Sequence, residues 1–167
     1  MTQREELLLA LKKAMQGEMD SVNLYKNAAN HAKDPEVKKF FSERMNEEQL
    51  HYNHILEYYK QISNNQEPRG VSQELEPEKM EAQIFTNDFM KRIGEDHVLF
   101  SAISTALLLE LRAMEHYAKL EAEQKHPTLK SFFAVMKKYE QIHYDDLAKI
   151  QKEAEEYYWQ VNDWQPF

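Results

Sequence analysis

The amino-acid sequence repeats itself at a constant offset of 92 residues. The segment EEQLHY at residues 47–52 returns as YEQIHY at residues 139–144, and Pro35 in one copy corresponds to Pro127 in the other. The two copies align without a gap, so both are expected to fold in the same way. Any fold proposed for the chain must therefore contain two equivalent halves.

Each copy has the features of a helical hairpin. The chain of 167 residues contains only 3 glycines and 5 prolines, which favours long helices. Between residues 127 and 158 the apolar positions recur at steps of three and four residues, the period of an amphipathic helix. In the first copy, Asp34 and Pro35 are a typical N-cap and first helical residue, and they predict a tight turn between two helices.

Two such hairpins predict an all-α fold, a four-helix bundle with one long connection. The length of the chain fits a single domain over residues 1–167. The predicted segments are hairpin one at about residues 3–61, a crossover at about 62–96, hairpin two at about 97–158 and an aromatic tail at 159–167. Residues 82–96 are predicted to form a short helix or an ordered part of the crossover. The tail is predicted to pack on the bundle or on a neighbouring subunit.

Charge and composition exclude several classes of protein. The net charge of −8 disfavours nucleic acid as a partner, and the lack of cysteine excludes disulfides and thiol catalysis. The N-terminal segment has charges on both sides of a short apolar patch, with Thr2 and Glu5 at the spacing of a capping box, and this is not a signal peptide. The longest uncharged run, residues 98–109, is shorter than the ~20 residues of a membrane span. We therefore expect a cytoplasmic protein without a membrane partner.

Six side chains that can bind metal ions occur at matching positions of the two copies. They are Glu18 and Glu110, Glu48 and Glu140, and His51 and His143. Glu18 precedes the turn at Asp34 by 16 residues and Glu48 follows it by 14, so at ~1.5 Å per residue both lie roughly 20–25 Å from the turn. The two carboxylates are therefore predicted to lie level with each other, and the second hairpin repeats the arrangement.

All six side chains fall in the apolar stripes, where Leu or Phe is expected. Four buried carboxylates without partners would destabilise the fold by several kcal/mol each, whereas two divalent cations would balance their charge. A single Glu-x-x-His segment often arises by chance on a solvated helix face. Two copies, each level with a further Glu, indicate a binuclear site of the kind that holds two iron or two manganese ions in helical bundles.

The neighbouring polar residues are assigned smaller roles. Tyr25 and Tyr117 each follow a predicted ligand by seven residues, and we expect them to donate hydrogen bonds to the ligand carboxylates, with core packing as the alternative. Glu47 is not assigned as a ligand, because its counterpart in the second copy is Tyr139. The remaining histidines are predicted to be surface or capping residues: His31, His54, His97, His116 and His126.

Four segments carry a family resemblance: GEMDSVNLY, EEQLHYNHI, LELRAMEHY and YEQIHYDDL. Through them nearly the whole chain resembles the rubrerythrin branch of the ferritin-like superfamily. The resemblance implies a ferritin-like bundle with a non-haem di-iron centre that reacts with peroxide or dioxygen. It further implies that Glu48 and Glu140 bridge the two metals, and that the terminal ligands are Glu18 with His51 and Glu110 with His143.

The sequence departs from that family in two respects. It lacks the four cysteines of the rubredoxin module, so the resemblance implies that electrons come from a separate protein, such as a rubredoxin, or from the substrate iron itself. It also has Ala113 where those enzymes have an additional Glu. The sequence is thus similar to a stand-alone, simplified member of the family.

The function expected from these features is that of an oxidoreductase that reduces hydrogen peroxide or dioxygen at two iron ions, with manganese as the other candidate metal. The alternative is a ferroxidase that oxidises Fe(II) for storage or transfer. Two further readings rank lower: metals that act only as structural links, and hydroxylation of an organic substrate near a membrane. The long crossover and the aromatic tail also suggest a homodimer.

Overall fold

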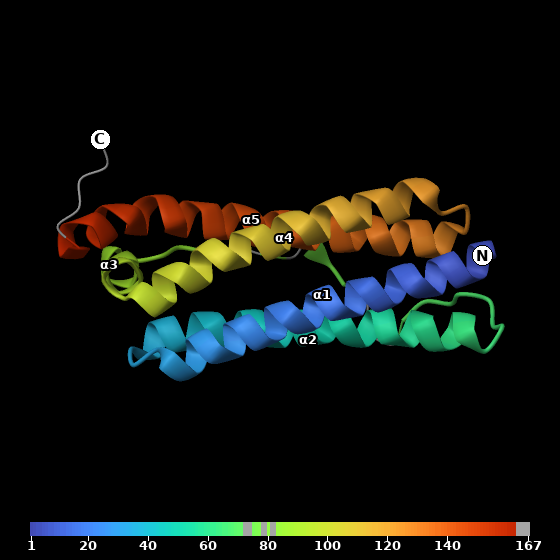
Figure 1. Cartoon of the computed structure of the whole chain (residues 1–167), viewed down its shortest axis with the longest axis horizontal. Helices are drawn as coiled ribbons and strands as arrows, with labels where there is room; N and C mark the ends of the chain where they lie inside the picture. The colour runs from blue at the N-terminus through green and yellow to red at the C-terminus, as the bar shows by residue number, and fades with distance from the viewer. Residues whose placement is uncertain (72–74, 78–79, 81–82, 163–167) are drawn as a thin grey trace.

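The computed structural model describes residues 1–71, 75–77, 80 and 83–162. These residues form an all-α structure of four long helices and one short helix (Figure 1). The helices are α1 (Gln3–His31), α2 (Pro35–Ser63), α3 (Asn87–Glu95), α4 (His97–Glu123) and α5 (Pro127–Asn162). The prediction of an all-α, ferritin-like four-helix bundle is confirmed.

The long helices form two antiparallel hairpins. Helix α1 pairs with α2, and α4 pairs with α5, while α1 and α4 meet where the hairpins face each other. The connection from α2 to α3 returns the chain to the opposite end of the bundle, where α3 lies across the ends of the long helices (Figure 1). Because of this return, α1 and α4 also run in opposite directions.

Side chains at the helix starts satisfy the free backbone N–H groups. Thr2 and Glu5 form the predicted capping box, in which Glu5 Oε2 accepts a hydrogen bond from the Thr2 backbone N–H at 2.7 Å. Asp34 accepts hydrogen bonds from the first turn of α2. Asp96 caps α4, and its carboxylate also lies 2.8 Å from His31 Nε2, which links the end of α1 to the start of α4.

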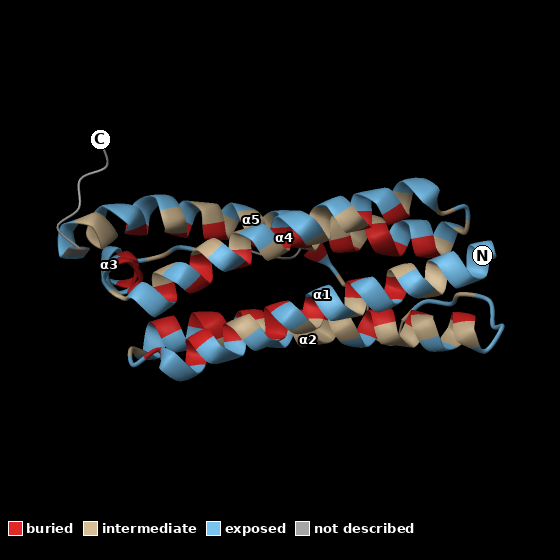
Figure 2. Ribbon diagram, in the orientation of Figure 1, coloured by how far each residue is buried: buried red, intermediate tan, exposed pale blue. Residues whose placement is uncertain are grey.

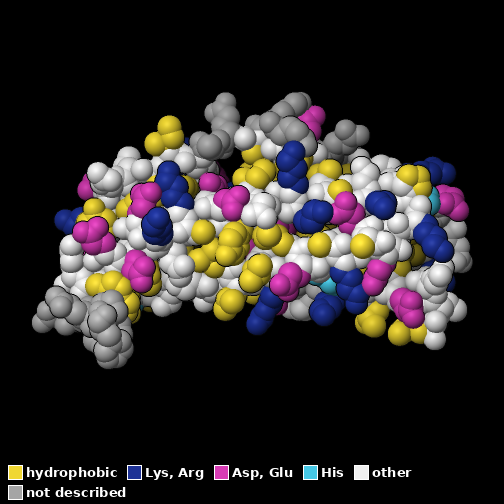
Figure 3. Space-filling model, turned by 90° about the horizontal axis from the view of Figure 1, so that it is seen from above, with side chains coloured by type: hydrophobic (Ala, Val, Ile, Leu, Met, Phe, Trp, Pro, Cys, Tyr) yellow, Lys and Arg dark blue, Asp and Glu magenta, His cyan; other side chains and the backbone are white. Residues whose placement is uncertain are grey.

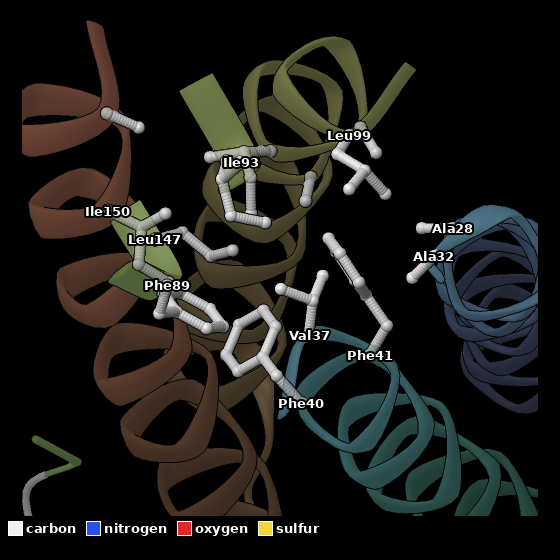
Figure 4. Close-up of a cluster of buried hydrophobic side chains, with 14 of the residues drawn as sticks. Ala28, Ala32, Val37, Phe40, Phe41, Phe89, Ile93, Leu99, Leu147 and Ile150 are labelled. Carbon is white, nitrogen blue, oxygen red and sulfur yellow. The ribbon is translucent and has the colours of Figure 1, made fainter. Parts of the chain in front are cut away.

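Apolar side chains fill the bundle in two clusters. At the α3 end, Phe40 packs with Phe41 and Phe89 at ring-centroid distances of 5.1 and 5.5 Å (Figure 4). Leu11 and Phe133 belong to the second cluster, which includes the C-terminal part of α2 and the N-terminal part of α5. The buried residues of the long helices face the interior of the bundle (Figure 2). A set of buried polar side chains lies between the two clusters.

Helix α3 packs closely on the C-terminal part of α5. A Cβ atom added to Gly94 would collide with the backbone carbonyl oxygen of Ala154 and with Cβ of Tyr157. Only glycine therefore permits this approach between α3 and α5. The short helix lies within the segment 82–96, for which the sequence left a short helix and an ordered connection as alternatives.

Helix α5 is longer than the sequence predicts. It continues to Asn162, so residues 159–162 of the predicted tail belong to the helix. Residues 155–162 contain neither glycine nor proline, and Trp159 Nε1 donates a hydrogen bond to Glu155 Oε1 one turn earlier, at 3.2 Å. The rest of the predicted tail, residues 163–167, lies outside the described residues.

Helix α4 is the one helix within the described residues that is long and apolar enough to cross a membrane. Its most apolar window has a mean hydropathy of 1.3, and 28% of that window is buried. A single helix of this kind is weak evidence for a membrane span, and α4 carries Glu110, which is buried in the bundle. Leu108 and Leu111 on the same helix are 55% and 39% exposed.

Candidate metal centre

The six side chains predicted as metal ligands lie together in the middle of the bundle, and each long helix contributes at least one. Helix α1 contributes Glu18, α2 contributes Glu48 and His51, α4 contributes Glu110, and α5 contributes Glu140 and His143. Each of these residues is at most 3% exposed. The side chains form two overlapping groups, one with Glu18 and His51 and the other with Glu110 and His143, and both groups contain Glu48 and Glu140.

Each group is compact enough to surround one metal ion. Within a group, the candidate ligand atoms lie within 4.8 Å of one another. Since two carboxylates belong to both groups, the arrangement can hold two ions that share Glu48 and Glu140. The repeat alone did not identify these two as the shared pair, but the same pair is implied by the family resemblance.

The two imidazole rings present equivalent atoms to the site. His51 Nδ1 lies 3.1 Å from Glu48 Oε2 and 3.2 Å from Glu140 Oε1. His143 Nδ1 lies 2.8 Å from Glu48 Oε1 and 3.5 Å from Glu140 Oε2. The rings are stacked with their centroids 5.8 Å apart. Both histidines can therefore coordinate through Nδ1, which leaves each Nε2 facing away from the centre.

The two unshared carboxyls hold their protons more strongly than ordinary glutamates in the absence of metal. Burial, followed by the charge of Glu140, raises the pKa of Glu18 well above its usual value. Burial and the charge of Glu48 do the same for the pKa of Glu110. The shared pair behaves in the opposite way. Burial opposes its ionisation, but the two histidines outweigh this effect, so the pKa of Glu48 falls well below its usual range and that of Glu140 falls to about 2.

The two histidines are protonated in the metal-free site. Burial alone would lower their pKa values, but the charges of Glu140 on His51 and of Glu48 on His143 raise both values well above the usual one. Two imidazolium ions then balance the two ionised carboxylates. Metal ions can bind only if they displace these protons, because a ligand must present a free lone pair.

The shared carboxylate of Glu140 shows that the donor set fits a pair of metal ions. Glu140 is 1% exposed, and neither of its oxygens makes a well-aligned hydrogen bond to a described residue. Both oxygens therefore remain available as ligand atoms, and metal coordination would use both. Four carboxylates and two imidazoles suit iron or manganese better than zinc or copper.

Two buried tyrosines hold the unshared carboxylates from the opposite hairpin. The Tyr25 hydroxyl donates to Glu110 Oε1 at 2.7 Å, and the Tyr117 hydroxyl donates to Glu18 Oε1. Burial, followed by the charge of the accepting carboxylate, raises the pKa of each tyrosine well above its usual value. The sequence suggested such donors but did not reveal that each pair crosses between α1 and α4.

Beyond His143, a partly buried chain of charged groups extends away from the centre. His143 Nε2 lies 2.9 Å from Glu47 Oε2, in a close contact that is not aligned as an ideal hydrogen bond. Arg44, which is 2% exposed, donates to Glu47 Oε2 at 2.9 Å and to Asp146 Oδ2 at 2.5 Å. Burial opposes the ionisation of Glu47, but the contacts with His143 and Arg44 lower its pKa.

Sequence reasoning missed this chain of charges. It set Glu47 aside because the repeat does not preserve it, and it did not consider Arg44 or Asp146. The available signal was an arginine in the inward-facing stripe of α2, where an apolar residue is expected. His54 is also buried, at 2% exposure, so its assignment as a surface or capping residue is wrong.

A cavity of about 250 Å³ connects the centre with the surface between α1 and α4. Its inner wall includes the four carboxylates of the centre, and its outer wall includes exposed residues such as Lys13, Gly17 and Arg112. Leu109 and Ala113 form part of the wall between them. A small molecule can thus approach the shared carboxylates from one side of the bundle.

Comparison with known proteins agrees with this arrangement. Residues 10–151 match the family model described as rubrerythrin. This range contains α2 and α4 completely and omits only the start of α1 and the end of α5. Neither a curated protein nor a solved structure matches the chain significantly. The family match extends over the whole carboxylate and histidine cluster and over most of the sequence. The chain belongs to the rubrerythrin family.

Proposed function

We propose that the protein is a non-haem di-iron oxidoreductase that reduces hydrogen peroxide or dioxygen. The observation that carries this proposal is the cavity of about 250 Å³ that reaches four buried carboxylates from the surface. A purely structural metal site needs no such opening. A site that consumes a small oxidant needs one, and the cavity is large enough for such a molecule.

The side chains of the cluster would hold the iron ions in two equivalent sets. Glu48 and Glu140 would be shared, Glu18 and His51 would complete one set, and Glu110 and His143 would complete the other. When bound, two ferrous ions supply the two electrons that convert hydrogen peroxide and two protons into two water molecules. The family match supports di-iron binding, and the mixture of oxygen and nitrogen donors is equally suited to manganese.

The protein itself contributes a dry, preorganised environment. The apolar clusters on both sides of the centre keep water out, so an oxidant reaches the carboxylates from the cavity between α1 and α4. Tyr25 and Tyr117 hold Glu110 and Glu18 in place by hydrogen bonds. Both hydroxyls keep their protons at neutral pH, because burial and the neighbouring carboxylates raise their pKa values.

The alternative is a ferroxidase, in which Fe(II) is the substrate. The net charge of −8 favours the approach of cations, and Asp20 lies at the outer part of the cavity. Lys13 and Arg112 lie at the same opening and repel cations. These two positive charges hinder the entry of Fe(II) but not that of a neutral oxidant, so we favour peroxide or dioxygen as the substrate.

Three further proposals concern the surroundings of the enzyme. A separate protein such as a rubredoxin would return electrons to the iron ions, because the chain has no cysteines for a rubredoxin module of its own.

A homodimer would cover exposed apolar side chains, among them Leu108 and Leu111 on α4. Apolar side chains also gather in the middle of the face shown in Figure 3. The enzyme would work in the cytoplasm.

The test is to load the protein anaerobically with two Fe(II) per chain and then add one equivalent of hydrogen peroxide. We expect rapid consumption of the peroxide, a ferric absorption band, and renewed turnover when an electron donor is supplied. In a second assay, excess Fe(II) is added in air. Continued oxidation of many iron ions per chain without peroxide turnover would favour the ferroxidase instead. The Glu140→Ala variant is the control, since it should lose both reactions.

A further inference from the structure

Three residues that contact one another depart from the internal repeat. Arg44, Glu47 and Asp146 form a continuous set of ion pairs next to the centre. Their counterparts at the offset of 92 residues are Met136, Tyr139 and His54. The six residues of the centre follow the repeat without exception, so these departures give the two equivalent ligand sets different surroundings.

Because these three residues are not repeated, the surroundings of the two histidines differ on the side that faces away from the centre. The outward atom of His143, Nε2, lies 2.9 Å from the carboxylate of Glu47. Neither Nε2 atom makes an aligned hydrogen bond to a described residue, but the carboxylates near His51 contact its Nδ1 atom instead of Nε2. Tyr139 packs its ring edge against His51 with the centroids 5.1 Å apart. Tyr139 also lies near His143, at a centroid distance of 6.3 Å, so the difference between the two rings is the carboxylate of Glu47 at His143 Nε2.

The charge around His143 is also negative overall. Glu47 and Asp146 carry two negative charges and Arg44 carries one positive charge, so the set holds one more negative charge than positive. The three corresponding residues, Met136, Tyr139 and the buried His54, include no carboxylate. The side chains of Arg44, Asp146 and Glu47 are 2%, 18% and 34% exposed, so water screens this difference only in part.

We propose that Glu47, positioned by Arg44 and Asp146, makes the His143 side of the centre the tighter of two metal positions, so that this side fills first. A carboxylate behind a coordinating imidazole fixes the ring and strengthens it as a donor, and loss of such a partner typically weakens metal binding 10–100-fold. Glu47 acts through His143 and is therefore a positioning residue. The proposal rests on the binuclear site of the proposed function but not on its redox activity.

The test is an anaerobic titration of the metal-free protein with Co(II), followed by calorimetry and by the visible absorption of the bound ion. We expect two binding steps of unequal affinity. The Glu47→Gln variant keeps the size of the side chain but loses its charge, and it should weaken the tighter step about 10–100-fold while the weaker step changes little. Tyr139→Phe, at the corresponding position beside His51, should leave the tighter step unchanged.

A second pair of variants assigns the tighter step to one side. His51→Ala should retain the tight step, whereas His143→Ala should lose it. If Glu47→Gln lowers the thermal stability of the metal-free protein too far, the triple variant Arg44→Met, Glu47→Gln and Asp146→Asn removes all three charges together and answers the same question. Thermal unfolding followed by circular dichroism shows which variant is suitable.

The outcomes separate this inference from the proposed function. Two equal binding steps, or an equal effect of Glu47→Gln on both steps, would overturn the order of filling but leave a binuclear centre intact. Ordered binding of two metals in a protein whose iron form ignores peroxide and dioxygen would overturn the proposed function alone. A protein that binds no metal would contradict both.

Discussion

The hydroxyl of Tyr25 on α1 donates a hydrogen bond to Oε1 of Glu110 on α4, 2.7 Å away and in the other hairpin. The reciprocal bond from Tyr117 to Glu18 completes a crossed pair. Because α1 and α4 are antiparallel, each tyrosine extends from its own helix toward the carboxylate of the opposite one. The two hairpins are therefore held together next to the centre by hydrogen bonds as well as by any metal.

The Tyr25→Phe variant tests the contribution of this bond. Removing the hydroxyl leaves a buried oxygen of Glu110 without its donor, so we expect the free energy of unfolding of the metal-free protein to fall by about 1–3 kcal/mol. Urea denaturation measures the change. Tyr144 is a partly buried tyrosine next to His143 in the sequence. The Tyr144→Phe variant serves as the control and should change the free energy of unfolding by less. Equal effects of the two substitutions would contradict a specific role for the bond.

Shared and unshared carboxylates should differ in how many metal ions their removal affects. Glu140 belongs to both ligand groups and Glu18 to one, so Glu140→Ala should abolish binding of the metal pair, whereas Glu18→Ala should leave one ion per chain. Elemental analysis after loading with Fe(II) and desalting gives the two stoichiometries. Retention of one ion by Glu140→Ala would show that this carboxylate does not bridge.

Metal binding should release protons and weaken at low pH. Four groups have pKa values raised well above the usual ones in the metal-free protein: Glu18, Glu110, His51 and His143. Each must be without its proton to act as a ligand, and the raised pKa values favour the protonated forms, so loading the pair near neutral pH should release protons. Calorimetry in buffers of different ionisation enthalpy measures the number. A value near zero would mean that the ligands are already deprotonated.

The same pKa values predict how the stability of the metal-free protein depends on pH. Folding raises the pKa values of His51 and His143. Their contribution to the free energy of unfolding is therefore complete at a pH below their pKa in the unfolded chain, and it is lost as the pH rises through their pKa in the folded protein. Glu48 and Glu140 behave oppositely, and their contribution is lost as the pH falls through their lowered values. Melting curves without metal should therefore show decreasing stability at both alkaline and acidic pH, and a flat profile would contradict the charge arrangement.

Two glycines offer a matched test of the packing. Gly94→Ala places a methyl group against the carbonyl of Ala154, so we expect the protein to lose about 1–3 kcal/mol of stability. Gly17→Ala places it in open space within α1, where alanine is the better helix former, and should add about 0.5–1 kcal/mol. Thermal unfolding compares the two. A neutral Gly94→Ala would show that α3 can move away from α5 at little cost.

The features that follow from local spacing could be predicted from the sequence. Asp34 and Pro35 indicate the first turn, and the matching positions of Glu48 and Glu140 bring the candidate ligands to one level. Contacts between the hairpins could not be predicted, because the rotation of α1 against α4 is set by packing. The acceptor of Tyr25 and the ion pair between Arg44 and Asp146 depend on that rotation.

The gapless repeat has a consequence for the ancestry of such a chain. A single hairpin that paired with an identical copy could form the same set of four carboxylates and two imidazoles, but every substitution would then appear twice. Once both copies are encoded in one gene, a mutation at position 47 no longer alters position 139. Glu47 and Tyr139 now differ, whereas in an assembly of two identical hairpins both positions would carry the same residue.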